Sequence, residues 1–154
     1  MNTIKGRVMV DGHGEGIALV TRMPMNFTAA FTKGGNILPG MRSAFMDRHH
    51  ELYRQKVKNR VLVFPACIGS TGAGGALVEL MFAREAPAAM IIQRADSLLV
   101  AGAVIGDVWF GRGFPVIEYG SDDIYEKIHT GDHVEVDGTT GEIRIITGGK
   151  NSLP

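Results

Sequence analysis

The sequence predicts one α/β domain, in which a core of alternating strands and helices lies between two β-hairpins. Three observations lead to this prediction. Short buried apolar runs alternate with longer apolar stretches in the middle of the chain. Segments of alternating polar and apolar residues joined by glycine turns occur at both ends. The 154 residues suffice for one domain with a real core, so we expect a single domain over 1–154.

The central unit of the chain is RVLVFPACIGSTGAGGALVELMFAR, residues 60–84. Its apolar run Val61–Phe64 predicts a buried strand that ends at Pro65, because proline has no N–H to donate to a neighbouring strand. A turn of small residues, Gly69–Gly75, follows the strand. The apolar residues after the turn predict a helix over Gly72–Arg84.

A strand, a glycine-rich turn and a helix in this order present backbone N–H groups at a helix N-terminus. These groups and the helix dipole favour an anion such as a carboxylate or phosphate. Ser70 and Thr71 lie where their hydroxyls either cap the helix, each contributing about 1 kcal/mol, or reach into a site. The turn lacks the P-loop pattern and a full GxGxxG, so on its own it favours the capping alternative and indicates an anion site of no defined kind.

The remaining segments follow the same patterns. Further strands are predicted at Lys5–Val10, Gly16–Thr21, Ala89–Gln93, Pro115–Tyr119, His133–Asp137 and Glu142–Ile146, and further helices at Leu98–Phe110 and Asp122–Ile128. The first two strands and the last two are each expected to pair as a hairpin across a glycine-rich turn. Met23–Gly40 predicts a long loop of the kind that often carries function. Asp47–Lys58 is either a short helix or an ordered loop.

The two central helices carry little charge. The helix after the turn has Glu79 alone before its last residue, and the segment from Leu98 to Ile105 has no charge. Surface helices usually have a polar face. Either both helices are buried inside the domain, or one of them meets a partner subunit.

Composition excludes several classes of function. Sixteen basic and sixteen acidic residues balance, which argues against nucleic acid or a membrane surface as a partner. A single cysteine excludes an internal disulfide and an iron–sulfur cluster held by this chain alone. No apolar stretch approaches the ~18 residues that span a bilayer. The first residues lack the apolar core of a signal peptide, so a cytoplasmic protein is expected.

Other residues with chemical potential each have an ordinary explanation as well. His129 and His133 are four apart, but Gly131 and Asp132 between them indicate a turn, which argues against a zinc site. Cys67 either is a small buried side chain or faces whatever the turn binds. Arg112 either pairs with a substrate carboxylate or is a solvated loop residue.

The segments PACIGSTGAGGALVEL, EAPAAMIIQ and FGRGFPVI together resemble the small subunit of the aconitase X enzymes. In that family the chain forms the swivelling β/β/α, barrel-like domain of the aconitase superfamily. Pro65, Gly69, Ser70 and Thr71 match the turn pattern of the family, and the resemblance covers a core of about 5–146. Cys67 and its neighbour stand where the family often has a glycine and a basic residue, so the differences touch loops that face the substrate.

The resemblance implies a hydro-lyase (dehydratase) subunit that is active only with a large aconitase X-type subunit. It implies an iron–sulfur cluster held by that partner, which binds the leaving hydroxyl as a Lewis acid. Cys67 is an outside candidate for a ligand of the cluster. Ser70 is the implied base, which takes a proton from the carbon next to the substrate carboxylate. Gly69, Thr71, Gly72 and Arg112 are the expected substrate-binding residues.

Alternatives remain for substrate and role. The family dehydrates cis-3-hydroxy-L-proline or 5-phosphomevalonate, and the neutral charge with no extra basic cluster near the turn favours the hydroxyproline. The ending from Thr130 to Gly141 is similar to the mobile phosphohistidine domain of phosphoenolpyruvate-utilising enzymes. That domain needs a histidine at the start of its helix, and the corresponding stretch Ala95–Ala103 has none. A non-catalytic domain that only closes another protein's site is the third alternative.

Overall fold

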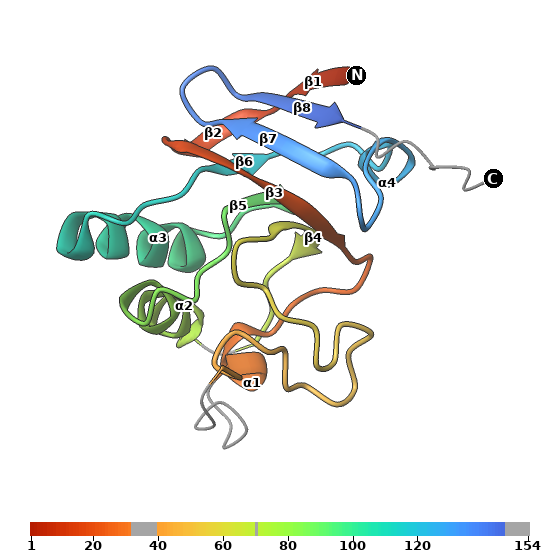
Figure 1. The fold of residues 1–154 in the computed structure, drawn as a ribbon. Coiled ribbons are helices and arrows are strands. Elements are labelled where there is room, and N and C mark those ends of the chain that lie inside the picture. Colours follow the sequence, from red (N-terminus) through yellow and green to blue (C-terminus); the bar gives the residue numbers. More distant parts are fainter. Residues whose placement is uncertain (32–39, 70, 147–154) are drawn as a thin grey trace.

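The computed structural model describes residues 1–31, 40–69 and 71–146. They form a three-layered β/β/α arrangement (Figure 1), which confirms the expected fold class. In chain order the elements are β1 (Asn2–Lys5), β2 (Arg7–Val10), β3 (His13–Val20), α1 (Phe27–Phe31), β4 (Val61–Ala66), α2 (Ala73–Phe82), β5 (Ala89–Arg94), α3 (Ser97–Phe110), β6 (Val116–Glu118), α4 (Ile124–Lys127), β7 (His133–Asp137) and β8 (Glu142–Ile146).

All eight strands belong to one sheet in the order β1-β8-β7-β3-β4-β5-β6-β2. The four central strands, β3 to β6, run parallel, and the strands on both sides are antiparallel to their neighbours. β3 links the two β layers, because His13–Ile17 pairs with β7 and Ala18–Val20 pairs with β4. Because β3 to β6 run parallel, their carboxyl ends lie at one common edge of the sheet.

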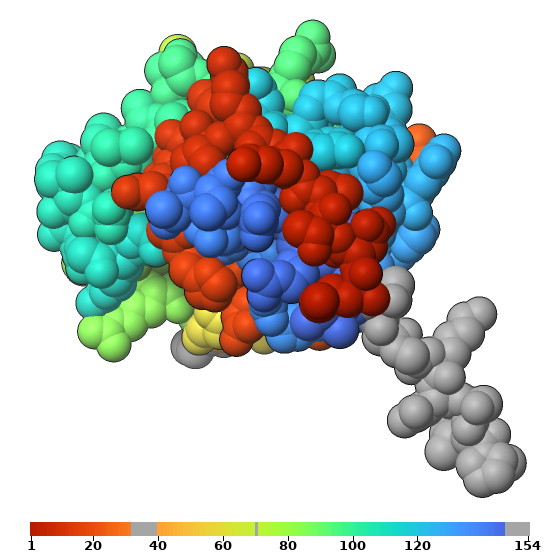
Figure 2. All heavy atoms as spheres, turned by 90° about the horizontal axis from the view of Figure 1, so that it is seen from above, coloured from red at the N-terminus to blue at the C-terminus, as the bar shows by residue number. Residues whose placement is uncertain are grey.

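Gly6 closes the sheet into a barrel-like form. β1 and β2 lie at opposite ends of the strand order but are separated in sequence by this residue alone. The Gly6 N–H donates to the Gly141 carbonyl at 3.0 Å. A Cβ at Gly6 would lie 2.7 Å from the Glu118 carbonyl oxygen, so a side chain does not fit there. Figure 2 shows the N-terminal segment (red) beside the C-terminal strands (blue) on this face.

The N-terminal hairpin prediction is wrong. Lys5–Val10 is not one strand, since Gly6 lets the chain turn from β8 on one edge of the sheet to β6 on the other. The strand predicted at Gly16–Thr21 is β3, which starts earlier, at His13, and pairs with β7 and β4 instead of β2. The C-terminal hairpin is confirmed with its predicted bounds.

The central strands are buried on both faces and supply two cores. Leu62 and Phe64 of β4 contribute to the core beneath the helices. Val61 and Val63 point the other way, into the barrel. The same alternation holds in β5, because successive side chains of a strand point to opposite faces. The continuous apolar run at residues 61–64 is thus the signature of a strand covered on both sides.

Helices α2 and α3 form the third layer and touch through backbone. A Cβ on Gly102 would lie 2.6 Å from the Gly74 Cα, and Gly106 lies directly against the Met81 side chain. Each helix connects two parallel strands, so both N-termini lie at the edge where those strands end. The predicted helix Leu98–Phe110 is confirmed, and the Asp96 Oδ1 accepts from the Leu99 N–H at 2.8 Å as its N-cap.

The predicted end of one strand and one predicted loop need correction, and a second loop is as expected. Pro65 does not end β4, because β5 pairs with the residues on either side of it, Phe64 and Ala66. Met23–Gly40 holds the five-residue helix α1, and its residues 32–39 lie outside the described part. Asp47–Lys58 is an ordered loop, the second of the two predicted alternatives. Among the described residues, no helix is both long and apolar enough to cross a membrane.

The contact between α2 and α3 predicts opposite effects for two glycines. Gly102→Ala is expected to lower the free energy of unfolding by about 1–3 kcal/mol, because the new Cβ meets the backbone of Gly74. Gly75→Ala is the matched control, since nothing lies within 4 Å of a Cβ there. It should leave stability unchanged or raise it by up to ~1 kcal/mol. Denaturant unfolding measures both, and equal stabilities would contradict the packing argument.

Candidate active site at the carboxyl edge of the sheet

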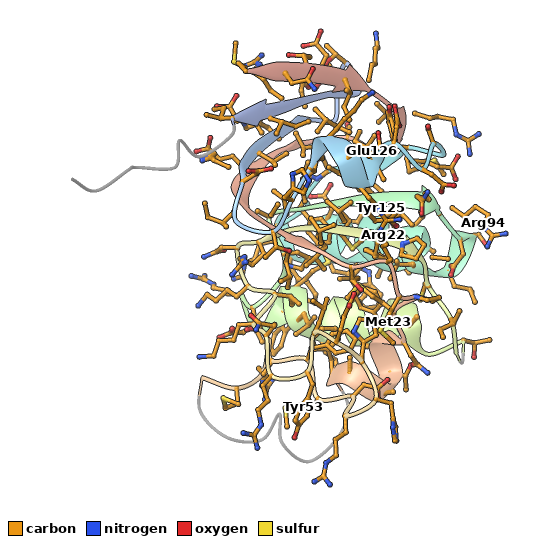
Figure 3. All side chains as sticks on the ribbon, turned by 90° about the vertical axis from the view of Figure 1, so that its right-hand side faces the viewer. Arg22, Met23, Tyr53, Arg94, Tyr125 and Glu126 are labelled. Atoms are coloured by element: carbon orange, nitrogen blue, oxygen red, sulfur yellow. The ribbon has the colours of Figure 1, made fainter. Side chains whose placement is uncertain are left out.

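The candidate site lies where the parallel strands end and α2 begins. In sheets of this kind, ligands bind outside the carboxyl ends of the strands. Figure 3 views this edge, with Arg22 and Met23 just beyond β3 and Arg94 at the end of β5. The turn between β4 and α2 opens at the same edge. The sequence pattern of strand, glycine turn and helix is therefore confirmed as local structure.

The turn is tied to the segment that follows β3. The Met25 N–H donates to the Ala66 carbonyl at 2.9 Å, and the Ile68 N–H donates to the Met25 carbonyl at 3.0 Å. Gly69 has φ +104°, and a Cβ there would lie 2.7 Å from Oδ1 of Asn26. Only glycine combines this backbone conformation with this close contact. The backbone of the turn therefore requires a glycine at position 69, one of the expected substrate-binding residues.

The described residues between Gly69 and α2 are open to solvent. Thr71 and Gly72 are exposed, and α2 starts at Ala73. Gly72 is the N-cap residue and makes no side-chain cap hydrogen bond. Thr71 therefore does not occupy the N-cap position that the capping alternative required. Ser70, the expected base, lies outside the described residues, so its role stays a prediction.

Cys67 lies at the base of the turn, half-buried, with its Sγ 3.9 Å from the Ile68 carbonyl oxygen. Burial, and secondarily the nearby Asp96 carboxylate, raises the pKa of its thiol to about 11. Burial therefore disfavours the thiolate form, which is the form that reacts and binds metals. Since Cys67 is the one cysteine of the sequence, this chain does not by itself supply the several thiolates that hold an iron–sulfur cluster.

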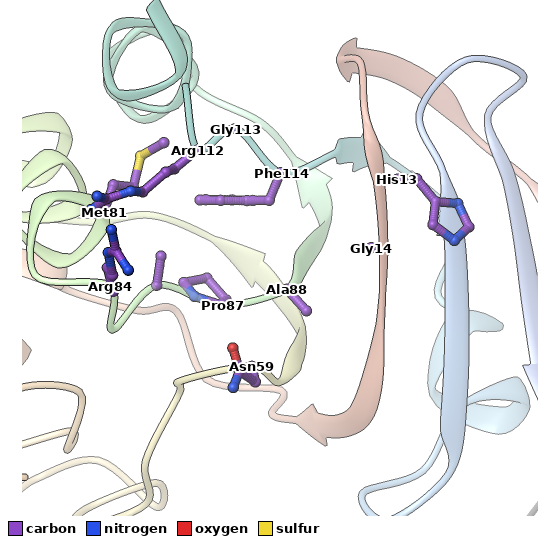
Figure 4. Close-up of a pocket in the computed structure, with 11 residues that line it drawn as sticks. His13, Gly14, Asn59, Met81, Arg84, Pro87, Ala88, Arg112, Gly113 and Phe114 are labelled. Carbon is purple, nitrogen blue, oxygen red and sulfur yellow. The ribbon is translucent and has the colours of Figure 1, made fainter. Parts of the chain in front are cut away.

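Arg112 does not lie at the turn. Its Nη1 donates to the carbonyl of Phe82, the last residue of α2, at 3.1 Å. Helix α2 has ten residues, which corresponds to about 15 Å. The structure thus places Arg112 at the opposite end of the helix from Gly72, in a cavity that also contains Arg84 (Figure 4). The predicted substrate-binding set is divided between two ends of the domain.

Two other arginines lie at the candidate edge and were missed. Arg94 is the last residue of β5 and Arg22 lies two residues after the last residue of β3, and this position after a parallel strand is the signal in the sequence that could have identified them. The Arg22 guanidinium lies 4.6 Å from the centroid of the Tyr125 ring. Arg22 also lines a cavity of about 240 Å³ together with Thr21, whose hydroxyl donates to the Glu51 carboxylate.

His50 orders the loop beside the turn. The Leu52 N–H donates to its Nδ1 at 3.1 Å, so the proton of the neutral ring is on Nε2, which lies 3.2 Å from the Pro24 carbonyl oxygen. The ring is buried and packs on Phe45, with centroids 4.5 Å apart. His50 thus supports the loop that carries Met25 and Asn26.

A separate cluster of potential ligands joins β3 and β7. One ligand atom from each of Glu15, His133 and Glu135 lies within 4.8 Å of the others. Glu135, however, accepts a hydrogen bond from Arg144 at 2.8 Å, which neutralises the carboxylate that a cation would need. This cluster is explained as a cross-strand charge network on the sheet surface.

Comparison with known proteins identifies the family. A family model described as the aconitase X swivel domain matches residues 3–145. The chain belongs to this family. It is 34% identical to the phosphomevalonate dehydratase small subunit of Methanocella arvoryzae, over 92% of this chain and 98% of that protein. A cis-3-hydroxy-L-proline dehydratase of Hypocrea jecorina is 29% identical over 88% of this chain, but the match covers only 22% of that protein.

A solved structure agrees with this family. Thermococcus kodakaraensis aconitase X, in its holo-form, superimposes with a TM-score of 0.77 at 30% identity, covering 95% of this chain and 99% of that one. The resemblance inferred from the residues around the turn is thereby confirmed. The named relatives are dehydratases or their small subunits, which confirms the expectation of a hydro-lyase subunit.

The environment of Cys67 predicts a slow thiol. In the folded chain at pH 8, iodoacetamide should alkylate it about 100-fold more slowly than in the denatured chain, because the thiolate fraction falls as the pKa rises from 9.0 to about 11. Asp96→Asn is the control, since asparagine keeps the helix cap and removes the charge. It should react faster than the unaltered chain. Equal rates in the folded and denatured chains would contradict the assigned environment.

Proposed function

We propose that this chain is the small subunit of an aconitase X-type dehydratase, and that it closes over a small hydroxy acid held by a larger subunit. Ser70 is the base in this proposal. The observation that carries it is the exposed glycine turn at the N-terminus of α2, on the edge where the parallel strands end. Family membership supplies the reaction class, and the turn supplies the chemistry that this chain contributes.

Dehydration removes a proton from the carbon beside the carboxylate and the hydroxyl from the next carbon, which leaves a carbon–carbon double bond. A serine hydroxyl is a poor base unless its alkoxide is stabilised. Backbone N–H groups at a helix N-terminus and the helix dipole provide such stabilisation. They also favour the substrate carboxylate, so one turn can serve both the base and the substrate.

The implied cluster belongs to the larger subunit in this proposal. A single cysteine does not hold an iron–sulfur cluster, and the family relationship is what points to this cofactor. The contribution of this chain is then to orient the substrate and to exclude water from the closed site. Arg22 and Arg94, just after β3 and at the end of β5, are the basic side chains that flank the site on this edge.

Two substrates are candidates, each favoured by a different observation. The relatives from Methanocella and Methanocaldococcus, at 34% and 32% identity, are named for phosphomevalonate. Cis-3-hydroxy-L-proline is favoured by the turn itself, because its described residues, Cys67–Gly69 and Thr71–Gly72, carry no cation, so that Arg22 or Arg94 beside the turn would have to bind a phosphate. Turnover of each compound by the reconstituted enzyme separates them directly.

The proposed base predicts a selective loss of turnover. Ser70→Ala should lower kcat by about 10²–10⁴-fold in the two-subunit enzyme, while binding of the two subunits is unchanged. The matched control is Ser97→Ala, because Ser97 is an exposed serine in the first turn of α3 on the same edge. Its kcat should stay within about twofold of the unaltered enzyme. Near-normal turnover by Ser70→Ala would refute the base and leave the non-catalytic role.

A further inference from the structure

The exposed side chains of α3 from Leu98 to Trp109 are apolar except for Asp107. Asp107 is the single charged residue of this helix, and its Oδ1 is already bonded to the Gly113 N–H at 2.9 Å. Val108 is 75% exposed and Trp109 68% exposed. We define the α3 surface as these two residues with the other exposed apolar side chains of α3 and the neighbouring end of α2: Phe82, Leu98, Ala101, Val104 and Ile105. Figure 2 shows α3 (teal) projecting from one side of the molecule.

The aromatic residues of this surface form one cluster at the end remote from the turn. Phe82 is 65% exposed, and its ring centroid lies 5.4 Å from that of Phe110, which in turn contacts Trp109. Exposed apolar side chains that adjoin one another, with aromatic residues among them, are typical of a surface that binds another protein.

Two arginines adjoin the aromatic cluster in a cavity that no described acidic residue lines. They are Arg84 and Arg112, and the cavity has a volume of about 580 Å³ (Figure 4). Arg84 adopts φ +59°, a conformation that a residue with a Cβ rarely takes. A partner that covers this end is therefore expected to bring a carboxylate next to apolar side chains.

We propose that the α3 surface and the Arg84–Arg112 cavity form a second contact with the large dehydratase subunit, beyond the contact at the turn. This inference rests on the proposed function. The α3 surface adjoins the turn at the start of α2, because Gly74 in the first turn of α2 lies against Leu98, where the α3 surface begins. In the Hypocrea relative, the region that matches this chain is 22% of one longer chain, so the rest of that protein is joined covalently to the matching region.

A second copy of this chain fits the surface less well. In a symmetric pair the α3 surface would meet itself. α3 of the other copy would then offer one carboxylate, Asp107, for the two arginines. A large subunit with an acidic residue bordered by apolar side chains matches both the apolar surface and the charge.

The test uses the full chain and the aconitase X-type large subunit of the same organism, and it measures the Kd of the complex by titration. Val108→Glu should raise Kd by about tenfold or more, since a buried charge replaces an apolar contact. Arg84→Glu should raise it as well, and should weaken its dependence on salt. Ile146→Glu is the matched control, because Ile146 is an exposed apolar residue on β8, outside the α3 surface. Its Kd should be unchanged.

The outcomes separate this inference from the proposed function. Thermal unfolding of each isolated variant should match that of the unaltered chain, because the substituted side chains are exposed. An unchanged Kd for both Val108→Glu and Arg84→Glu overturns the second contact and leaves the dehydratase role intact. The isolated chain could instead form a dimer that Val108→Glu dissociates, while the Kd for the large subunit is unchanged. That result would assign the α3 surface to a second copy of this chain and would also overturn the second contact. Failure of the unaltered chain to bind the large subunit refutes the proposed function and the inference together.

Discussion

The close contact between α2 and α3 is the constraint on which the site depends. Gly74 and Gly102 bring the helix backbones together, and Gly106 lies against Met81 further along. The direction of the helices follows from the parallel strands that they connect, and their lateral position follows from this contact. Together these fix the N-terminus of α2, and with it the exposed turn, at the carboxyl edge of the sheet. A larger residue at the contact would shift the helix that carries the candidate chemistry.

Much of the fold follows from local patterns in the sequence. The strand at residues 61–64, both central helices and the C-terminal hairpin follow from apolar runs, caps and turn residues. Pairing partners do not follow in the same way, because they depend on closure of the whole sheet. Gly6 looked like an ordinary residue of one strand, whereas it is the point where the chain passes from one edge of the sheet to the other. Local alternation carries no information about that passage.

The site could be predicted where it is continuous in sequence and not where it depends on tertiary structure. The glycine turn is one segment, so its geometry follows from its residues. Arg112 is 40 positions after Gly72 in the chain, and its distance from the turn depends on how α3 lies along α2. Since the helices run in the same direction, the end of α3 meets the end of α2, and Arg112 meets Phe82. Arg22 and Arg94 lie at the candidate edge because they stand after or at the end of parallel strands, β3 and β5.

In the proposed complex, subunit binding and chemistry would lie at different parts of one helix pair. The N-terminal ends of α2 and α3 offer backbone N–H groups and a favourable dipole, which are suited to stabilising an anion. Their outer faces and C-terminal ends offer aromatic side chains and arginines, the residue types that dominate binding energy at protein interfaces. If a large subunit binds the outer face as proposed, that contact can hold the domain while contacts at the turn remain few and weak. Weak contacts at the turn suit a domain that must open to admit its substrate, because a strong grip there would oppose release of the product.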